Sequence, residues 1–230
     1  MFASVPPRAS TRPAIPAALA GRVRPLVAAS SRLIPVAPAL EALFPDRALR
    51  RGTTTVVRGP AGRGVRTLSL SMLSAASAAG HWCGVVGLAD PGISAMAELG
   101  LDLRRVVFIP DAGGDWATAA AELFDGVDLV LVRPSGVVSH TVARHLMSKA
   151  RERKSVLVVA CSTPRPWPLG PELELSLCAS RWRGVGEGHG HLVSREVEVE
   201  VTGRRGADRG ERLSLQLPAG LGAHRVQGAS

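Results

Sequence analysis

Aromatic side chains and cysteines are scarce in this chain of 230 residues. Tyrosine is absent and aromatic residues make up 3% of the sequence, which disfavours a single-strand nucleic-acid binder built from stacked aromatic rings. The three cysteines are far apart and form no CxxC pair, so we expect neither a zinc site nor a disulfide framework. The apolar sequence around Cys83 and Cys161 predicts that both are small buried side chains.

Long apolar runs are also lacking. The sequence contains no run of 18 apolar residues, so we expect no transmembrane helix. The short apolar stretches near the start are interrupted by prolines and by Arg8, Arg12 and Arg22, a pattern unlike that of a secretory signal. These two features predict a cytoplasmic protein.

Lysine is nearly absent, although the chain is strongly basic. The net charge is +9, and only Lys149 and Lys154 are lysines, so the positive charge is almost entirely arginine. A basic balance permits contact with nucleic acid or with an acidic protein. Because abundant arginine, alanine and glycine also fit a GC-rich genome, the charge by itself does not decide between these partners.

Three parts can be distinguished along the chain. Residues 1–36 are rich in proline, alanine, serine and arginine and predict a loosely attached arm, with a helical piece near residues 17–30. Residues 37–218 predict a folded core, which opens with a short helix at 38–44. Residues 219–230 predict a flexible tail.

The core begins with alternating strands and helices. Short apolar runs predict strands at 53–58, 83–88, 105–109, 128–132 and 155–160. Helical periodicity predicts helices at 67–79, 92–100, 116–124 and 141–153. Strictly alternating segments follow at 172–182, 192–202 and 212–217. This order predicts an α/β fold with a mostly parallel sheet between helices, extended by antiparallel C-terminal strands.

A glycine-rich loop lies between the first strand and the first long helix, where a phosphate-binding loop belongs. Gly59 and Gly64 have the G-x-x-x-x-G spacing, with Gly62 between them. The lysine that grips the β- and γ-phosphates is replaced by Val65. The hydroxyl that holds magnesium is replaced by Arg66, with Thr67 one residue later. The loop therefore keeps the spacing of a nucleotide site and lacks its chemistry.

The second element of such a site is altered as well. A nucleotide-hydrolysing enzyme usually ends a later apolar strand with an aspartate for the magnesium shell. Here the strand at 128–132 is followed by Arg133, whose charge would repel magnesium. Asp128 begins that strand and is expected about 13 Å away, at its other end. We therefore predict no catalytic residue, no ATPase activity and no bound cofactor or metal.

Residues 49–160 resemble the core of the RecA superfamily. The resemblance is carried by GPAGRGVRTL at 59–68, AELGLD at 97–102, RRVVFIP at 104–110 and VDLVLVRP at 127–134, in this order. It implies a RecA-like fold with degenerate Walker A and Walker B elements. Asp90 is the only acid near the position of the catalytic glutamate of RecA, and we interpret it as a turn residue before Pro91 and Gly92.

Within this superfamily, the altered loop, the size and the arginine-rich composition are similar to ImuA-type proteins, most closely the actinobacterial variant. This resemblance implies a role in damage-induced mutagenesis and translesion DNA synthesis, within the SOS response. It implies a partner, ImuB, which is an inactive relative of the Y-family polymerases. Through ImuB it implies an error-prone C-family DNA polymerase.

A basic cluster lies on and just after the helix predicted at 141–153. Its members are Arg144, Lys149, Arg151, Arg153 and Lys154. They form either a solvated helix face or a set of phosphate contacts for nucleic acid, and the sequence leaves both interpretations open. We interpret His189 and His191 as part of a turn between strands, and we expect Trp182 in the core.

Three functional hypotheses follow from these features. The first is a non-catalytic adaptor that binds an ImuB-like partner. The second is an ATP-dependent, RecA-like DNA-binding protein that uses Arg66 and Thr67 in place of the missing lysine and hydroxyl. The third is a basic DNA-binding module that uses no nucleotide.

Overall fold

The computed structural model describes residues 32–89, 92–161, 167–183, 194–203 and 210–217. The helical piece expected at 17–30, the tail at 219–230, Asp90 and the histidines at 189 and 191 lie outside these ranges. In the part that is described, no helix is both long and apolar enough to cross a bilayer.

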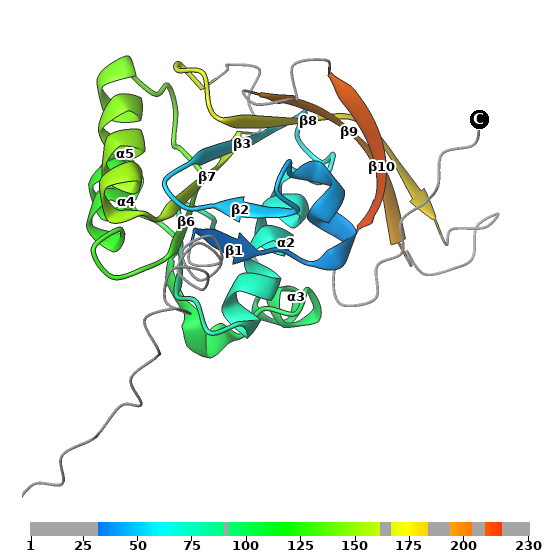
Figure 1. Cartoon of the computed structure of the whole chain (residues 1–230), viewed down its shortest axis with the longest axis horizontal. Coiled ribbons are helices and arrows are strands. Elements are labelled where there is room, and N and C mark those ends of the chain that lie inside the picture. Colours follow the sequence, from blue (N-terminus) through cyan, green and yellow to red (C-terminus); the bar gives the residue numbers. More distant parts are fainter. Residues whose placement is uncertain (1–31, 90–91, 162–166, 184–193, 204–209, 218–230) are drawn as a thin grey trace, which may run out of the picture. The chain divides into compact units, whose positions relative to one another are not determined.

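Eight of the described strands form one sheet, in the order β10-β9-β8-β3-β7-β6-β4-β5 (Figure 1). The strands from β8 to β5 in this order pair in parallel, and β8, β9 and β10 pair antiparallel. The α/β fold with a mostly parallel sheet and an antiparallel extension is therefore confirmed. The bounds are β3 Thr54–Arg58, β4 Cys83–Val86, β5 Val106–Ile109, β6 Leu129–Val132, β7 Val156–Cys161, β8 Leu173–Arg183, β9 Ser194–Gly203 and β10 Glu211–Leu217.

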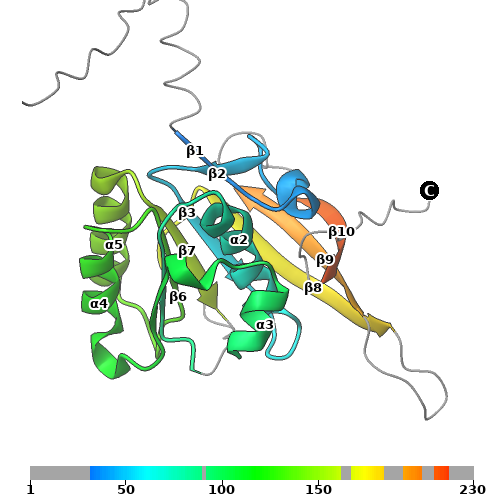
Figure 2. The ribbon, with the colours of Figure 1, turned by 90° about the horizontal axis from the view of Figure 1, so that it is seen from below.

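Helices cover both faces of the parallel strands, as Figure 2 shows. One face packs against α2 (Val65–Ala78), α3 (Ile93–Glu98) and the 3-10 helix η1 (Pro38–Leu43), and the other packs against α4 (Trp116–Leu123) and α5 (His140–Arg153). Alternate residues of each strand enter opposite cores: Val56 faces α4 and α5, and Val57 faces α2. Burial on both faces explains why these strands are continuously apolar.

Helix α2 has small polar side chains among its buried residues. Ser71, Ser74 and Ser77 are buried, and each hydroxyl donates to a backbone carbonyl three or four residues earlier in the helix. The Ser77 hydroxyl also accepts a hydrogen bond from the backbone N–H of Asp102 at 3.0 Å. These three buried hydroxyls are thus hydrogen-bonded within the helix.

The folded core begins earlier than the sequence indicated. Strand β1 (Leu33–Pro35) pairs antiparallel with β2 (Ala48–Arg50), and Ile34 is fully buried against the same core as η1. Residues 33–36 therefore belong to the core, and their assignment to the arm was wrong. The three-residue apolar stretch was too short to predict a strand without the pairing partner.

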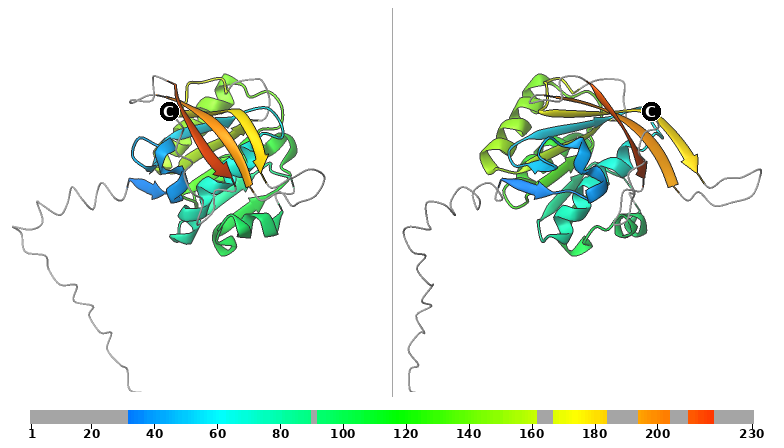
Figure 3. Two further views of the ribbon diagram at one scale, coloured as in Figure 1. Left: turned by 90° about the vertical axis from the view of Figure 1, so that its right-hand side faces the viewer. Right: turned by 45° about the vertical axis from the view of Figure 1, so that its right-hand side comes forward.

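The C-terminal strands lie side by side and alternate as predicted (Figure 3). Val197, Val199 and Val201 are buried, while the glutamates between them lie on the outer face. A β-bulge between Leu177 and Ala179 adds one residue to β8. Trp182 is 49% exposed, so its expected place in the core was wrong. It pairs with Arg195 near the open end of the extension, beyond the fully buried residues.

Asp128 lies at the amino edge of the sheet, the edge opposite the glycine-rich loop. Its carboxylate forms an ion pair with Arg51 at 2.7 Å and accepts a hydrogen bond from the backbone N–H of Trp82 at 3.1 Å. Partial burial would raise the pKa of Asp128, but the hydrogen bond and charge of Arg51 outweigh it and lower that pKa. Asp128 is thus a structural residue that joins the chain before β3 to the start of β6.

We predict that Asp128→Asn lowers the free energy of unfolding at pH 7 by about 1–3 kcal/mol, because it leaves Arg51 without its carboxylate. The carboxylate of Asp128 has a lower pKa in the folded chain than in the unfolded chain, where it is about 4. Its contribution to stability is therefore complete above about pH 4 and is lost as the pH falls through the pKa of the folded state. Urea unfolding of both proteins should therefore converge in acid. A constant difference between them down to pH 2 would contradict this.

We also predict that Gly87→Ala destabilises the core by at least about 2 kcal/mol. Gly87 follows β4 with φ +75°, and an added Cβ would lie 2.4 Å from the carbonyl oxygen of Arg133. Gly126→Ala is the matched control, because its Cβ would meet no atom within 4 Å. Urea midpoints should fall for the first variant and stay unchanged or rise slightly for the second. Equal midpoints would contradict the steric argument.

Candidate functional site

The glycine-rich loop lies at the carboxyl edge of the parallel strands. It follows β3 and leads into α2, whose first residue is Val65. The ends of β4, β6 and β7 meet at the same edge, because these strands run parallel to β3. Ligands of open parallel sheets bind in the crevice at this edge. The loop therefore occupies the position that the sequence predicted for it.

The backbone of the loop keeps the conformation that its glycines permit. Gly62 and Gly64 have φ values of 78° and 101°, and Gly64 is the N-cap of α2. A Cβ on Gly59 would lie 3.0 Å from the Cβ of Leu177 on β8, so only glycine fits there without displacement. The glycines are thus required by the fold itself, whether or not a ligand binds.

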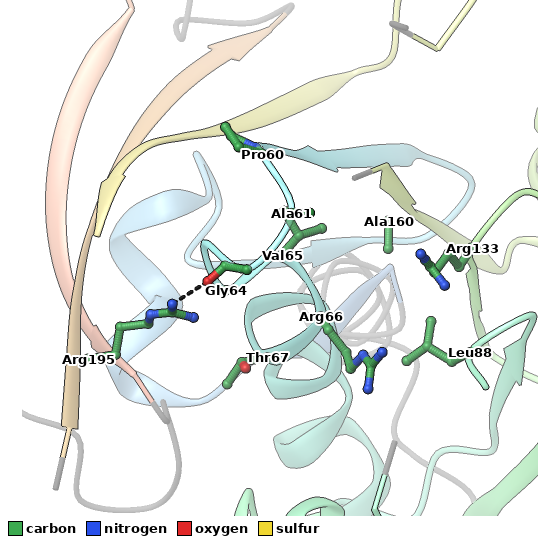
Figure 4. Close-up of a pocket in the computed structure, with 11 residues that line it drawn as sticks. Pro60, Ala61, Gly64, Val65, Arg66, Thr67, Leu88, Arg133, Ala160 and Arg195 are labelled. Carbon is green, nitrogen blue, oxygen red and sulfur yellow. Dashed lines mark hydrogen bonds between the residues drawn. The ribbon is translucent and has the colours of Figure 1, made fainter. Parts of the chain in front are cut away.

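A cavity of about 280 Å³ opens between this loop and the strand ends (Figure 4). It lies in front of the first turn of α2. Its lining comprises Pro60, Ala61, Gly62, Gly64, Val65, Arg66, Thr67, Leu88, Arg133, Ala160 and Arg195. These described lining residues include no aspartate or glutamate, although Asp90 near Leu88 is outside the described ranges.

Val65 stands where a nucleotide site has its lysine. It is 6% exposed and belongs to the hydrophobic core between α2 and the sheet. Its Cγ2 lies 3.3 Å from the position of a Cβ on Gly59, so the side chain packs under the loop. The lysine position has become part of the core, and it offers neither charge nor a hydrogen bond.

Three arginines from different elements surround the cavity. Arg66 is the second residue of α2, Arg133 follows β6, and Arg195 lies on β9. Figure 4 shows Arg66 extending towards Leu88 and Arg133, and Thr67 on the side of Arg195. Both Arg66 and Arg133 have further interactions within the structure. Three cations around one cavity favour an anion and repel a divalent metal ion.

Arg195, which comes from the C-terminal extension, was not among the residues expected at this site. Its guanidinium donates to the carbonyl of Gly62 in the loop and stacks on Trp182, 4.2 Å from the ring centroid. Its Nε is buried without a hydrogen-bond partner, and burial lowers the pKa of Arg195. Among the described residues, it forms no ion pair with a carboxylate. The alternation of the strand could have revealed it, because residue 195 falls on the same face of β9 as the buried Val197, Val199 and Val201.

The predicted basic cluster lies on and just after α5, but acidic residues occupy much of it. Lys149 and Arg153 pair with Asp125 at 3.4 and 2.8 Å, and Arg151 pairs with Glu172 at 3.4 Å. Arg144 is exposed, and Lys154 ends the helix in the left-handed conformation. The structure therefore brings the five cations together on one helix and ties three of them to carboxylates.

The remaining candidate chemistry is limited. Cys83 and Cys161 are buried as predicted, and burial raises the pKa of their thiols to about 12 and about 11. Neither thiol is thus a nucleophile at neutral pH. Within the described ranges, no group of three or more potential ligands is placed to hold a metal ion.

Comparison with known proteins agrees with the fold. A crystal structure of the flagellar accessory protein FlaH from Methanocaldococcus jannaschii superimposes with a TM-score of 0.56 over 86% of this chain and 99% of that chain, at 9% identity. This likeness concerns the fold alone, which is RecA-like in both proteins.

Two sequence matches are more direct. The chain is 41% identical over 97 residues to the uncharacterized protein Rv3395c of Mycobacterium tuberculosis, a match covering 42% of this chain and 48% of that protein. The chain thus spans about half the length of the curated relative it matches. Residues 42–168, just over half of the chain, match the MT3502 N-terminal domain and include the glycine-rich loop and all the parallel strands up to β7. The chain therefore belongs to the MT3502 N-terminal domain family.

Proposed function

We propose that this chain is a non-catalytic, RecA-like accessory protein that binds a protein partner and does not hydrolyse ATP. One observation carries the proposal: the cavity at the glycine-rich loop is bordered by a buried valine and three arginines, and its described lining holds no carboxylate. Hydrolysis by a loop of this kind needs a lysine on the β- and γ-phosphates and a magnesium ion held by a hydroxyl and an aspartate. The described lining holds no lysine and no aspartate, and its one side-chain hydroxyl is that of Thr67.

The position of the aspartate supports the same proposal. Arg133 follows the strand that would carry it, and its backbone N–H donates to the carbonyl of Val86 at 2.9 Å. Asp128 is at the other edge of the sheet and is already paired with Arg51. A magnesium ion at the loop would face cations in place of ligands.

The partner and the process follow from the sequence resemblance. We propose that the chain acts in damage-induced mutagenesis and translesion DNA synthesis by binding an ImuB-like, inactive Y-family polymerase relative, and through it an error-prone C-family polymerase. A RecA-like body that keeps its glycines and core while losing the phosphate and metal groups supports a role in recognition. Contact with DNA through Arg144 and its neighbours on α5 remains part of this proposal.

A second candidate is an ATP-dependent DNA-binding protein that uses Arg66 and Thr67. It is favoured by the fact that both residues line the cavity. The side chain of Arg66 leaves the first turn of α2, where the helix dipole also favours an anion. The two candidates differ in whether nucleotide binds tightly and in a magnesium-dependent way.

We predict background-level ATP hydrolysis and no saturable micromolar ATP binding by the wild-type chain with magnesium. The double variant Val65→Lys/Arg66→Thr restores the G-x-x-x-x-G-K-T spacing and should bind ATP at least about tenfold more tightly without hydrolysing it, because Arg133 remains. Fluorescent-nucleotide titration and phosphate release measure both effects. Micromolar binding by the wild type that is lost in Thr67→Ala would overturn the non-catalytic assignment in favour of the second candidate.

We predict that the chain forms a stable complex with the ImuB-like protein of the same genome after nuclease treatment. Size-exclusion chromatography of the mixed, purified proteins should show one joint peak. A catalytically active Y-family polymerase of that genome is the control and should elute separately. Absence of a joint peak with the ImuB-like protein would remove the partner assignment.

A further inference from the structure

A second cavity adjoins the arginine-lined cavity. It has a volume of about 220 Å³ and lies between α2, α3 and the C-terminal strands. Its walls are mainly apolar, with one acid, Glu98, and two arginines at the end nearest the loop. The lining comprises Arg66, Thr67, Leu70, Ala95, Glu98, Leu99, Trp182, Arg195 and Leu217. We call this cavity the apolar groove.

A large aromatic side chain is exposed in the wall of the groove. Trp182 is 49% exposed there. A tryptophan in water beside an apolar hollow is a feature of a surface that another molecule covers. The lining side chains come from five different elements: α2, α3 with its C-cap Leu99, β8, β9 and β10.

The groove is continuous with the arginine-lined cavity, because Arg66, Thr67 and Arg195 border both. Arg195 is the residue at their junction. Its charge is partly desolvated, its Nε is buried without a partner, and no carboxylate pairs with it within the described ranges. The guanidinium donates to the carbonyl of Gly62 and covers Trp182, and it brings a positive charge to the edge of the groove. The junction therefore combines an apolar hollow with positive charge.

We propose that this double cavity is the docking site for a segment of the protein partner that places apolar side chains in the groove and a carboxylate against Arg66 and Arg195. The proposal rests on the proposed function, and it names the surface and the chemistry by which the partner is recognised. Arginine pairs with carboxylates through two parallel hydrogen bonds, which fix the orientation of the carboxylate and also stabilise the contact. The carboxylate would lie where a nucleotide-binding relative has its phosphates.

Charge and shape favour an acidic, apolar peptide over nucleic acid. The guanidinium of Arg195 already covers a face of Trp182, so that face is closed to a stacking base. The walls formed by Leu70, Leu99 and Leu217 offer no donor or acceptor to a sugar or a base. A leucine or phenylalanine side chain followed by an aspartate or glutamate matches both halves of the site.

The test uses the full-length chain and short random peptides displayed for selection. Selected peptides should combine apolar residues with at least one Asp or Glu. Trp182→Ala and Arg66→Glu should each weaken binding of a selected peptide by about tenfold or more in fluorescence anisotropy. Arg104→Glu has the same change of charge on a side chain that is 89% exposed outside both cavities, and it should bind as the wild type does.

Exchanging the charges of the peptide and of residue 66 distinguishes a loss of recognition from misfolding of the variant. A selected peptide whose carboxylate residue is replaced by lysine should lose affinity for the wild type and regain it with Arg66→Glu. A variant that merely unfolds would regain nothing. Peptides without acidic residues, or equal binding by the wild type, Trp182→Ala and Arg66→Glu, would overturn the proposal. Displacement of the peptide by ATP or by single-stranded DNA at micromolar concentration would also overturn it.

The ImuB-like protein then distinguishes the two proposals. If it binds the wild type and both groove variants equally, the docking site proposed here is wrong and the partner assignment stands. If the variants lose the selected peptides while the ImuB-like protein never binds, the docking site stands and the partner assignment is wrong. Loss of ImuB-like binding in Trp182→Ala and Arg66→Glu, with Arg104→Glu unaffected, supports both.

Discussion

The burial of β3 on both faces and both edges is the constraint on which the rest of the structure depends. β3 pairs with β7 on one side and β8 on the other, and its valines enter opposite cores. The chain must leave this strand at the carboxyl edge and turn back at once for α2 to cover the sheet. Gly59 passes against Leu177, and Gly64 begins the helix with a positive φ. A tight glycine turn is therefore demanded by packing before any ligand is considered.

This constraint explains how a phosphate-binding shape persists without its chemistry. Val65 packs in the core beneath the loop, and a valine there buries apolar surface that a lysine would have to expose with its charge. The arginines of the site lie at its rim, on α2, after the end of β6 and on β9. Such a rim suits an anion that carries its own apolar anchor better than a nucleotide that brings a magnesium ion. The proposed role in recognition rests on where these charges lie.

The periodicity of the sequence was sufficient to predict the sheet, its helices and the place of the loop, because each depends on local apolar spacing. Val65, Arg66 and Arg133 were also recognisable, since a motif fixes their positions. Arg195 was not, because it is 133 residues from its hydrogen-bond acceptor Gly62. The partners of the α5 cations were missed for the same reason: Asp125 and Glu172 come from other segments. Trp182 was misplaced because its setting depends on strand register.

That register has a consequence for how insertions act on this protein. The extra residue of the β-bulge in β8 reverses which side of the sheet every later side chain of that strand faces, and the guanidinium of Arg63 in the loop binds the carbonyl of Cys178 within it. Inserting one further residue between Ala179 and Trp182, without a second bulge, would turn Trp182 towards the outer face, which carries the glutamates of β9, and would strip Arg195 of its aromatic cover. The number of residues in one strand thus decides whether Trp182 lies on the side of the sheet that faces Arg195 and the glycine-rich loop.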